Sequence, residues 1–552
     1  MLLKEYLREH ISKYVDIDTF SVEIPKNPEH GDYATNAAFL LGKQNKVNPV
    51  DLAKDLSQKL SDKNIDAYNI GPFINFRLTN NLLASEVMNI GDDYGKAQIG
   101  RKQKVLLEFV SANPTGPLHI GHGRWAVLGD VLKRMLCYTG YDAKAEFYVN
   151  DAGNQVNNLR KSVEAVRKGQ PIPEDGYHGE YIKDLAKTTD DPIEVMMAEQ
   201  KEVLDQLHVP FDTWFREQQL HAAGEVEKVG DYLDTYEKDG AVWFKTTEYG
   251  DDKDRVLIKA TGDPTYFAAD IAYHHNKLER GFKKLINIWG ADHHGYVARI
   301  QIGLKSELEK HNAELQIIIG QLVNLFRDGE PVRMSKRTGE MITLEEVMEE
   351  IGVDATRYFM VRYSPDTPID FDLGLAKKET MDNPVYYIQY AHARICSILR
   401  NAGSRDQGTG TRDQVRAIHE SPQHGSSSSQ SIECHPELDS GSRSSTQFPG
   451  TPELSTEAAD ELITNDYERA LAKKLVEFPD EVADAAQNAQ PHRITQYAED
   501  LAAVFHAFYH NCRVISDDAD QTAKRMLFVK ATQTVLHIIL EKILGINAPE
   551  RM

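Results

Sequence analysis

The chain has 552 residues, which is too many for a single hydrophobic core, so we expect three or four domains. Hydrophobic residues make up 41% of the sequence and charged residues 27%, which is ordinary for a globular protein. There is no run of 18 or more apolar residues, so we expect no transmembrane helix and no membrane partner. The four cysteines are far apart and form no CxxC pair, which predicts no structural metal site and favours a reducing, cytoplasmic location.

The net charge of −22 argues weakly against nucleic-acid binding, because phosphate contacts normally require a basic surface. A local basic patch can still exist on an acidic protein, so specific motifs must decide the question.

The first part of the chain, residues 1–100, predicts a small α/β domain. Strand-like runs occur at 20–25 and 73–78, and turn residues separate them from amphipathic helical stretches.

Residues 101–375 predict an α/β domain with a doubly wound, Rossmann-type parallel sheet. The apolar run KVLLEFV, beginning at residue 104, is typical of a strand covered on both faces. A helical stretch and a second strand-like run follow it, which makes a βαβ unit. That second run is 143–149, and further strands are expected at 255–260, 284–289 and 315–323. A charged, helical stretch at about 155–250 interrupts this pattern and is interpreted as an insertion.

Residues 376–552 carry helical periodicity without strand signals, which predicts an all-helical C-terminal bundle. Within it, the serine-rich stretch at about 404–455 is too polar to offset its ordering entropy. We therefore predict that it is a disordered insertion.

The segment ANPTGPLHIGHG, residues 112–123, follows a predicted buried strand and opens a helix. A helix N-terminus at the carboxyl edge of a parallel sheet is a phosphate-binding position. His119 and His122 share one helical face and can donate hydrogen bonds to ATP phosphates, and Gly121 allows close approach to the backbone. The alternative is a glycine-proline loop with two surface histidines.

The segment RMSKRTG, residues 333–339, supplies a candidate catalytic cation. Lys336 is placed to stabilise pyrophosphate oxygens as the bond to the α-phosphate breaks. Alone, such a basic loop is usually only solvated. Together with the HIGH-type motif about 210 residues earlier, it forms the signature of class I aminoacyl-tRNA synthetases.

The sequence resembles the bacterial-type arginyl-tRNA synthetases over nearly its whole length apart from about 404–460. The similar segments are HGDYATNAA at 30–38, FVSANPTGPLHIGHGRWAVLGD at 109–130, YVNDAGNQVNNL at 148–159, IWGADHHGYVARI at 288–300, GVDATRYFMVRYSPDTPIDFDLGLA at 352–376 and NPVYYIQYAHARI at 383–395. The KMSKS-type motif departs from the family pattern at Arg333 and Arg337 but keeps Lys336.

The resemblance implies a two-step activity in which arginine is activated by ATP as arginyl-adenylate and then transferred to the terminal adenosine of its tRNA. It implies L-arginine, ATP with Mg²⁺ and tRNA(Arg) as partners. It also implies a tRNA-contacting N-terminal domain and an anticodon-binding bundle. We expect a monomer. The implied ATP-binding residues are Gly121, Gly290, Asp292, Met334 and Ser335, beside the catalytic His119, His122 and Lys336.

For arginine, the resemblance implies that Tyr266 and Asp270 hold the guanidinium, while Glu108, Ser111, Asn113 and His122 line the remaining pocket. The chemistry fits, because a guanidinium is a planar fork of donors that favours carboxylates. The residue pattern alone allows other interpretations of these side chains. Glu108 could bind a structural cation, Asp270 could be an ordinary surface acid, and the Gly290–Asp292 pattern could be a simple turn. His293 and His294 lack further spaced partners, so they are weak candidates for metal ligands.

Two other functions remain possible from sequence. A small-molecule nucleotidyltransferase also uses an HxGH loop, although it would not need the long helical bundle. A non-catalytic RNA-binding paralogue would keep the bundle, although it would not need His119, His122, Lys336 and Asp270.

Overall fold

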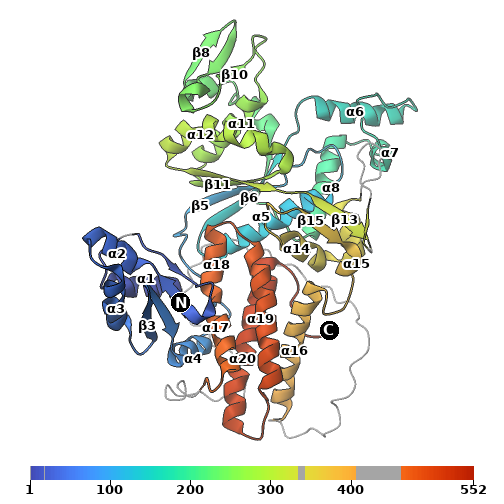
Figure 1. Cartoon of the computed structure of the whole chain (residues 1–552). Helices are drawn as coiled ribbons and strands as arrows, with labels where there is room; N and C mark the ends of the chain where they lie inside the picture. Colours follow the sequence, from blue (N-terminus) through green and yellow to red (C-terminus); the bar gives the residue numbers. More distant parts are fainter. Residues whose placement is uncertain (1, 18, 328, 333–341, 406–461) are drawn as a thin grey trace, which may run out of the picture.

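The computed structural model describes residues 2–17, 19–327, 329–332, 342–405 and 462–552. An α/β body lies above a bundle of long helices, and a smaller N-terminal part lies beside that bundle (Figure 1). Nearly all of the serine-rich stretch lies outside the described residues.

The N-terminal part is a four-stranded sheet with helices packed on it, as the sequence predicts. Its strand order is β1-β2-β4-β3, and all of its pairings are antiparallel. Its elements are α1 (Leu3–Ser12), β1 (Val22–Glu23), η1 (Pro28–His30), β2 (Tyr33–Thr35), α2 (Ala37–Asn45), α3 (Pro49–Leu60), β3 (Ile65–Ile70), β4 (Phe73–Leu78) and α4 (Asn80–Met88).

The central α/β body contains a five-stranded parallel sheet in the order β12-β11-β5-β6-β7. This order confirms the predicted doubly wound fold, because the chain starts in the middle strand and builds outward in both directions. Its strands and flanking helices are β5 (Lys104–Glu108), α5 (Ile120–Tyr138), β6 (Asp142–Val149), β7 (Thr213–Arg216), α11 (Tyr266–Glu279), β11 (Lys284–Gly290), η3 (Ala291–Tyr296), α12 (Val297–His311) and β12 (Glu314–Gly320).

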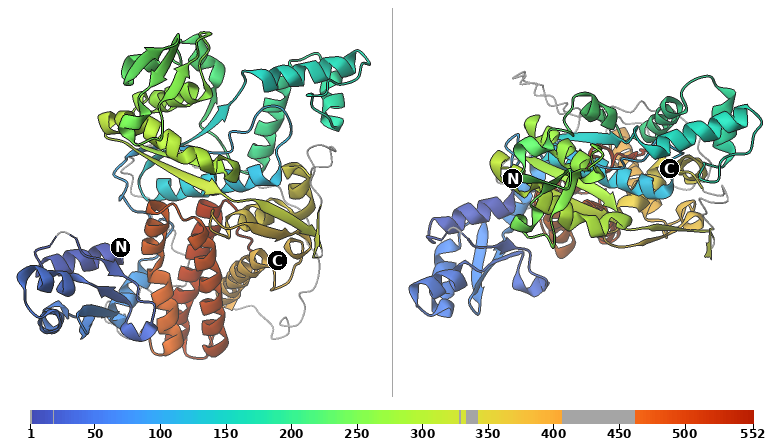
Figure 2. Two further views of the ribbon diagram at one scale, coloured as in Figure 1. Left: turned by 45° about the horizontal axis from the view of Figure 1, so that its top comes forward. Right: turned by 90° about the horizontal axis from the view of Figure 1, so that it is seen from above.

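The region expected to be a helical insertion contains more strand than the sequence indicates. β7 pairs with β6 at the edge of the main sheet, and a separate three-stranded antiparallel sheet projects from the body (Figure 2). The predicted strand at 255–260 belongs to this small sheet. The elements here are α6 (Asn154–Arg167), α7 (Glu180–Lys187), α8 (Pro192–Gln206), α9 (Glu217–Ala222), α10 (Val229–Tyr232), β8 (Thr235–Lys238), β9 (Ala241–Phe244), η2 (Thr246–Tyr249) and β10 (Arg255–Ile258).

The run expected as one strand at 315–323 is divided between two sheets. Its first part is β12, and its last residue begins β13, which lies in a second sheet of order β14-β13-β15. The elements of this connecting region are β13 (Val323–Arg327), β14 (Glu330–Pro331), α13 (Leu344–Ile351), α14 (Val353–Val361), β15 (Ile369–Asp372) and α15 (Leu373–Ala376).

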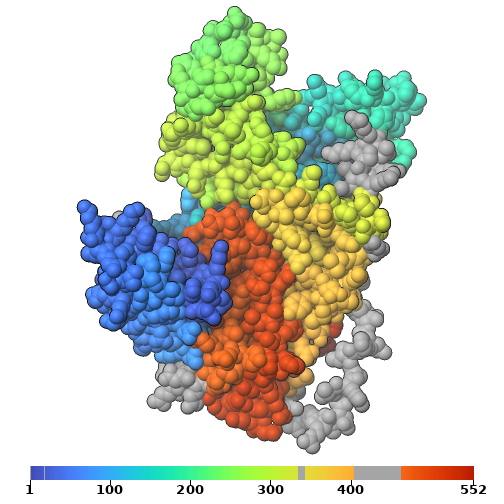
Figure 3. All heavy atoms as spheres, viewed as in Figure 1, coloured from blue at the N-terminus to red at the C-terminus, as the bar shows by residue number. Residues whose placement is uncertain are grey.

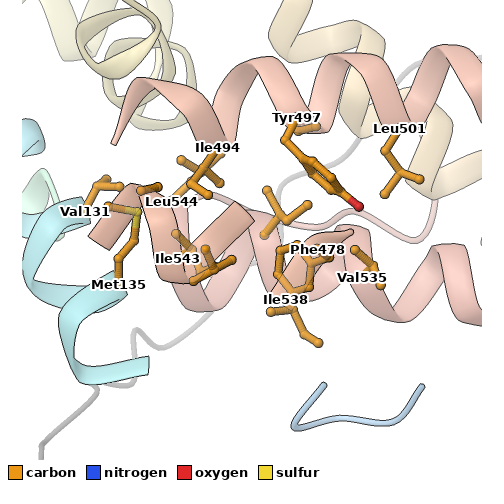
Figure 4. Close-up of a cluster of buried hydrophobic side chains, with 14 of the residues drawn as sticks. Val131, Met135, Phe478, Ile494, Tyr497, Leu501, Val535, Ile538, Ile543 and Leu544 are labelled. Atoms are coloured by element: carbon orange, nitrogen blue, oxygen red, sulfur yellow. The ribbon is translucent and has the colours of Figure 1, made fainter. Parts of the chain in front are cut away.

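The C-terminal part is helical throughout its described residues, as predicted. Apolar side chains of α5 meet those of the bundle in one continuous core, where Val131 and Met135 lie against Ile494, Ile543 and Leu544 (Figure 4). Among the described residues, no helix is long and apolar enough to cross a bilayer. The elements are α16 (Pro384–Arg405), α17 (Asp466–Val476), α18 (Phe478–Gln487), α19 (His492–Asn511), α20 (Ala519–His537) and η5 (Ile538–Leu544).

A fully buried guanidinium joins the central α/β body to the bundle. Arg357 of α14 donates to Asp130 of α5 at 2.5 Å and to the Leu544 carbonyl at 2.7 and 2.9 Å. It also donates to the carbonyls of Leu207 and His208. Burial alone would raise the pKa of Asp130, but its two arginine partners, Arg134 and Arg357, hold that pKa below its usual range. The ion pair therefore stays charged inside the core.

The N-terminal domain docks on the bundle through a second set of charges (Figure 3). Asp32 accepts a hydrogen bond from the Leu78 amide at 2.8 Å, and its carboxylate pairs with Arg469 and Lys473 of α17 at 3.2 and 2.9 Å. The Tyr33 hydroxyl donates to Asp480 of α18 at 3.0 Å. The N-terminal domain is thereby placed beside α17 and α18.

Replacing the buried guanidinium should destabilise the protein. In Arg357→Ala, Asp130 loses a buried partner and the carbonyls around Arg357 lose their donors, so we expect a loss of about 3–5 kcal/mol. Arg160→Ala is the matched control, because its pair with Asp191 is 43% and 38% exposed, and a surface pair contributes about 0–1 kcal/mol. Urea unfolding followed by circular dichroism measures both variants. Equal midpoints for the two would contradict the role assigned to Arg357.

Candidate active site

The site forms where the order of the parallel sheet reverses. β5 and β11 are neighbours, and the chain leaves them toward opposite edges of the sheet. Their carboxyl ends, Glu108 and Gly290, therefore border the crevice in which open α/β sheets bind ligands.

The two histidines of the HIGH-type motif cap the N-terminus of α5 at this crevice. The Gly121 amide donates to Nδ1 of His119 at 3.1 Å, and the His119 amide donates to Nδ1 of His122 at 3.3 Å. Their rings stack at 3.7 Å between centroids. Because Nδ1 of each ring accepts, the proton of each neutral ring is on Nε2. Both side chains thus supply N–H donors next to the positive end of the helix, which suits a phosphate.

Glycines at this surface make room for neighbouring side chains. A Cβ on Gly121 would lie 2.9 Å from the ring of His119, so a side chain there would displace the histidine. A Cβ on Gly290 would lie 2.9 Å from Trp125 and 2.7 Å from Asp292, and one on Gly320 would lie 2.4 Å from the same indole. Trp125 of α5 therefore needs glycine at the ends of two adjacent strands, β11 and β12.

The described residues that follow the KMSKS-type motif lie directly against the HIGH-type motif. The Leu344 amide donates to the Leu118 carbonyl at 2.8 Å, and Thr343 forms an isolated antiparallel bridge with His119. Met334, Ser335 and Lys336 themselves lie outside the described residues. They lie seven to ten residues before Thr343 and Leu344 in the chain, so they remain sequence-based assignments.

A buried ion pair forms the floor of the crevice at the end of β5. Lys277 of α11 donates to Oε2 of Glu108 at 2.6 Å, and Oγ of Ser111 donates to Oε1 at 3.1 Å. Lys277 is completely buried, and its ammonium lies 4.1 Å from the centroid of the Tyr273 ring. The backbone at Ser111 has a φ of 41°, an unfavourable value for a residue with a side chain. Both oxygens of Glu108 are therefore held in fixed positions.

Asp270 of α11 is the second carboxyl group of the pocket. The Tyr296 hydroxyl donates to its Oδ2 at 2.7 Å. Burial raises the pKa of Asp270 to about 7, with smaller contributions in the same direction from the charges of Glu108 and Glu217. Near neutral pH the side chain is therefore divided between its protonated and ionised forms.

The other predicted site residues are not all gathered at the same point. Tyr266 begins α11 with 78% of its surface exposed, whereas Asp270 one turn later faces inward. Asn113 donates to Gln155 of α6 at 2.7 Å. Asp292 and His293 pair at 3.6 Å with 80% and 57% of their side chains exposed.

Several side chains of the pocket were not predicted. Lys277 and Tyr296 hold the two carboxyl groups directly. Glu217 and Tyr148 add a further interacting pair, and burial followed by the charge of Glu217 raises the pKa of Tyr148 so that its hydroxyl stays protonated. Tyr148 and Tyr296 fall inside the segments that resemble the family, which is the only signal the sequence offered for them.

Three family models match separate parts of the chain. They describe an arginyl tRNA synthetase N terminal domain over residues 1–78, a class I (R) tRNA synthetase catalytic domain over 84–171 and a DALR anticodon binding domain over 448–552.

Similar proteins cover the whole chain. An arginine–tRNA ligase from Desulfitobacterium hafniense is 43% identical over 98% of this chain and 95% of its own. Arginine–tRNA ligase 1 from Halalkalibacterium halodurans is 42% identical over 100% and 99%. The solved structure of Thermus thermophilus arginyl-tRNA synthetase covers 100% of this chain and 99% of its own, with a TM-score of 0.72 at 22% identity, and so supports the fold.

A doubly wound parallel sheet with a capped His-x-Gly-His helix at its switch point defines the class I aminoacyl-tRNA synthetase catalytic domain. At more than 40% identity over nearly its full length, the chain belongs to the arginyl-tRNA synthetases.

Proposed function

We propose that the chain joins L-arginine to tRNA(Arg) with ATP, through arginyl-adenylate. The full-length similarity to arginine–tRNA ligases carries this proposal. The arrangement of the crevice supports it, because donors for phosphate and carboxylates for a guanidinium occupy adjoining parts of one sheet edge. We further propose that the enzyme acts in the cytoplasm as a monomer.

The first step is an in-line attack of the arginine carboxylate on the α-phosphorus of ATP, which releases pyrophosphate. Chemistry of this kind depends mainly on positioning and on stabilising charge. We assign His119, His122 and the N-terminal amides of α5 to the phosphates, and Lys336 to the departing pyrophosphate. Mg²⁺ enters with ATP as part of the substrate.

The nucleoside is assigned to the adjoining strand ends. Gly121 lies at the N-terminus of α5 and Gly290 at the end of β11, and the exposed Asp292 is assigned to the ribose. Met334 and Ser335 complete the ATP site with Lys336 in the same motif.

Arginine is assigned to the pocket between β5 and α11. Asp270 faces the guanidinium, and Tyr266 supplies an aromatic wall at the exposed start of α11. Glu108, Ser111, Asn113 and His122 line the side nearest the α5 loop. Lys277 neutralises Glu108 while leaving its oxygens in fixed places, so Asp270 carries most of the charge recognition.

In the second step, the 2′-hydroxyl of the terminal adenosine attacks the mixed anhydride. The N-terminal domain and the bundle lie side by side, and we assign tRNA contacts to both. An ATP–pyrophosphate exchange assay with arginine, with and without tRNA, tests the proposal. Exchange catalysed by a nucleotidyltransferase would not require arginine. A non-catalytic RNA-binding protein would bind tRNA but would show no ATP–pyrophosphate exchange.

Asp270→Asn should weaken arginine binding strongly. The variant keeps the size of the side chain and removes its charge, and truncating one member of a buried charge pair costs roughly 2–5 kcal/mol. At ~1.4 kcal/mol per tenfold, the dissociation constant should rise roughly 30- to 4,000-fold. ATP affinity should hardly change. Asp263→Asn, an exposed substitution just before α11, is the control. Near-normal arginine dependence in Asp270→Asn would refute the assignment.

Arginine affinity should increase with pH through neutrality. Only ionised Asp270 pairs with the guanidinium, and its pKa of about 7 leaves a small ionised fraction at pH 6 and a large one at pH 8. Apparent affinity scales with the competent fraction, so the dissociation constant should fall about tenfold between these values. Binding should also release a proton, which calorimetry in buffers of different ionisation enthalpy detects. The same pH slope in Asp270→Asn would show that another group titrates.

Lys336→Ala should slow adenylate formation much more than it weakens arginine binding. Its contact should strengthen as the pyrophosphate leaves, and removing one such charge-stabilising donor lowers kcat about 10²- to 10³-fold. Lys377→Ala is a suitable control, because that lysine is 49% exposed and pairs with Glu350. Single-turnover activation separates the two effects. An unchanged rate in Lys336→Ala would exclude the motif from catalysis.

A further inference from the structure

Two histidines and a glutamate converge at the ends of α11 and α12, away from the proposed arginine contacts. One ligand atom each from His275, Glu279 and His311 can be chosen so that all three lie within 4.8 Å of one another. His275 and Glu279 are four residues apart on α11 and so share one face, while His311 is the last residue of α12. The cluster therefore connects two neighbouring helices.

A buried carboxylate orients these histidines. Nδ1 of His275 lies 2.7 Å from Oε2 of Glu307, whose side chain is only 2% exposed. The other oxygen of Glu307 lies 3.5 Å from the ammonium of Lys310. Tyr232 stacks on the His275 ring at 4.0 Å, which fixes the plane of the imidazole. With Nδ1 bonded to a carboxylate, Nε2 of His275 is the nitrogen suited to a metal.

The remaining contacts fit an ion better than hydrogen bonds. Nε2 of His311 is a buried atom with no hydrogen-bond partner in the described part of the chain. It lies 3.4 Å from an oxygen of Glu279 and 3.6 Å from one of Glu307. Ligands bound tetrahedrally to zinc at ~2.0–2.1 Å are about 3.3–3.4 Å apart, so the first of these separations matches a shared ion.

We propose that His275, Glu279 and His311 bind one divalent transition-metal ion of the zinc class. Imidazole and carboxylate ligands suit this class, and three protein ligands leave a position for water. Glu307 acts as the positioning residue that holds His275. No step of arginine transfer uses this site, so the proposal stands apart from the proposed function.

The bound ion would tie the end of α11 to the end of α12. Asp270 lies five residues before His275 on the same helix, which is about 7.5 Å along its axis. The ion therefore sits behind the substrate pocket and would stabilise the packing that supports it. The two ligand-bearing segments are 32 residues or more apart in the chain, so sequence spacing gave no sign of the site.

The test uses the full-length chain after chelator treatment, without ATP or Mg²⁺. Titration with Zn²⁺ by calorimetry should show one ion per chain, and Co²⁺ should give the visible absorption of a low-coordinate site. His311→Ala should weaken Zn²⁺ binding by more than about 100-fold, and Glu307→Gln by about 10- to 100-fold. His10→Ala is the control, because its Nε2 lies 3.8 Å from the single carboxylate of Asp62.

A chain that binds no Zn²⁺ would overturn the proposal. So would equal affinity in wild type, His311→Ala and Glu279→Gln, because the ion would then lie elsewhere. Glu279 is 60% exposed, so Glu279→Gln should fold even if His311→Ala does not, which circular dichroism checks. At least tenfold weaker binding by Glu279→Gln, with unchanged binding by His10→Ala, would support the assignment.

Discussion

The buried Arg357–Asp130 pair sets the position of α5, and most of the molecule is arranged around that helix. Five guanidinium donors reach four carbonyl and carboxylate groups from α5, the end of α8 and the end of the bundle, which no other side chain could do at once. Gly545 has a φ of 66°, and a Cβ there would lie 2.6 Å from the guanidinium. The pair and its glycine fix the middle of α5, while His119 and His122 lie at its N-terminus.

In the crevice proposed for arginine, neighbouring groups offset the charges of the buried carboxyl groups. Clustered carboxylates in a buried crevice repel one another and are poorly solvated. One of them, Glu108, is neutralised permanently by Lys277, and the other, Asp270, by a proton that it holds with a pKa of about 7. Only the protonation of Asp270 is reversible. The structure therefore separates a fixed ion pair from a titrating carboxyl, which under the proposed function exchanges its proton for a guanidinium.

The sequence predicted what depends on local pattern. The apolar runs of β5, β6 and β11 and the HIGH-type loop were found because burial on both faces and helix capping leave a continuous signal. β7 is four residues long and gave no such signal. The contact of Lys277 with Glu108 spans 169 residues, and no spacing rule connects them. Helical periodicity placed Tyr266 and Asp270 on one face but could not show that the helix emerges at Tyr266 and leaves it exposed.

The helix α11 links the proposed arginine site to the proposed metal site. Its first half carries Asp270, and its last turn carries His275 and Glu279 of the proposed metal site. Asp270 is held by Tyr296, the residue directly before α12, and His311 ends that same helix. Both sites therefore depend on how α11 packs against α12. If either ligand changes that packing, thermodynamic linkage requires that each change the affinity of the other by the same factor.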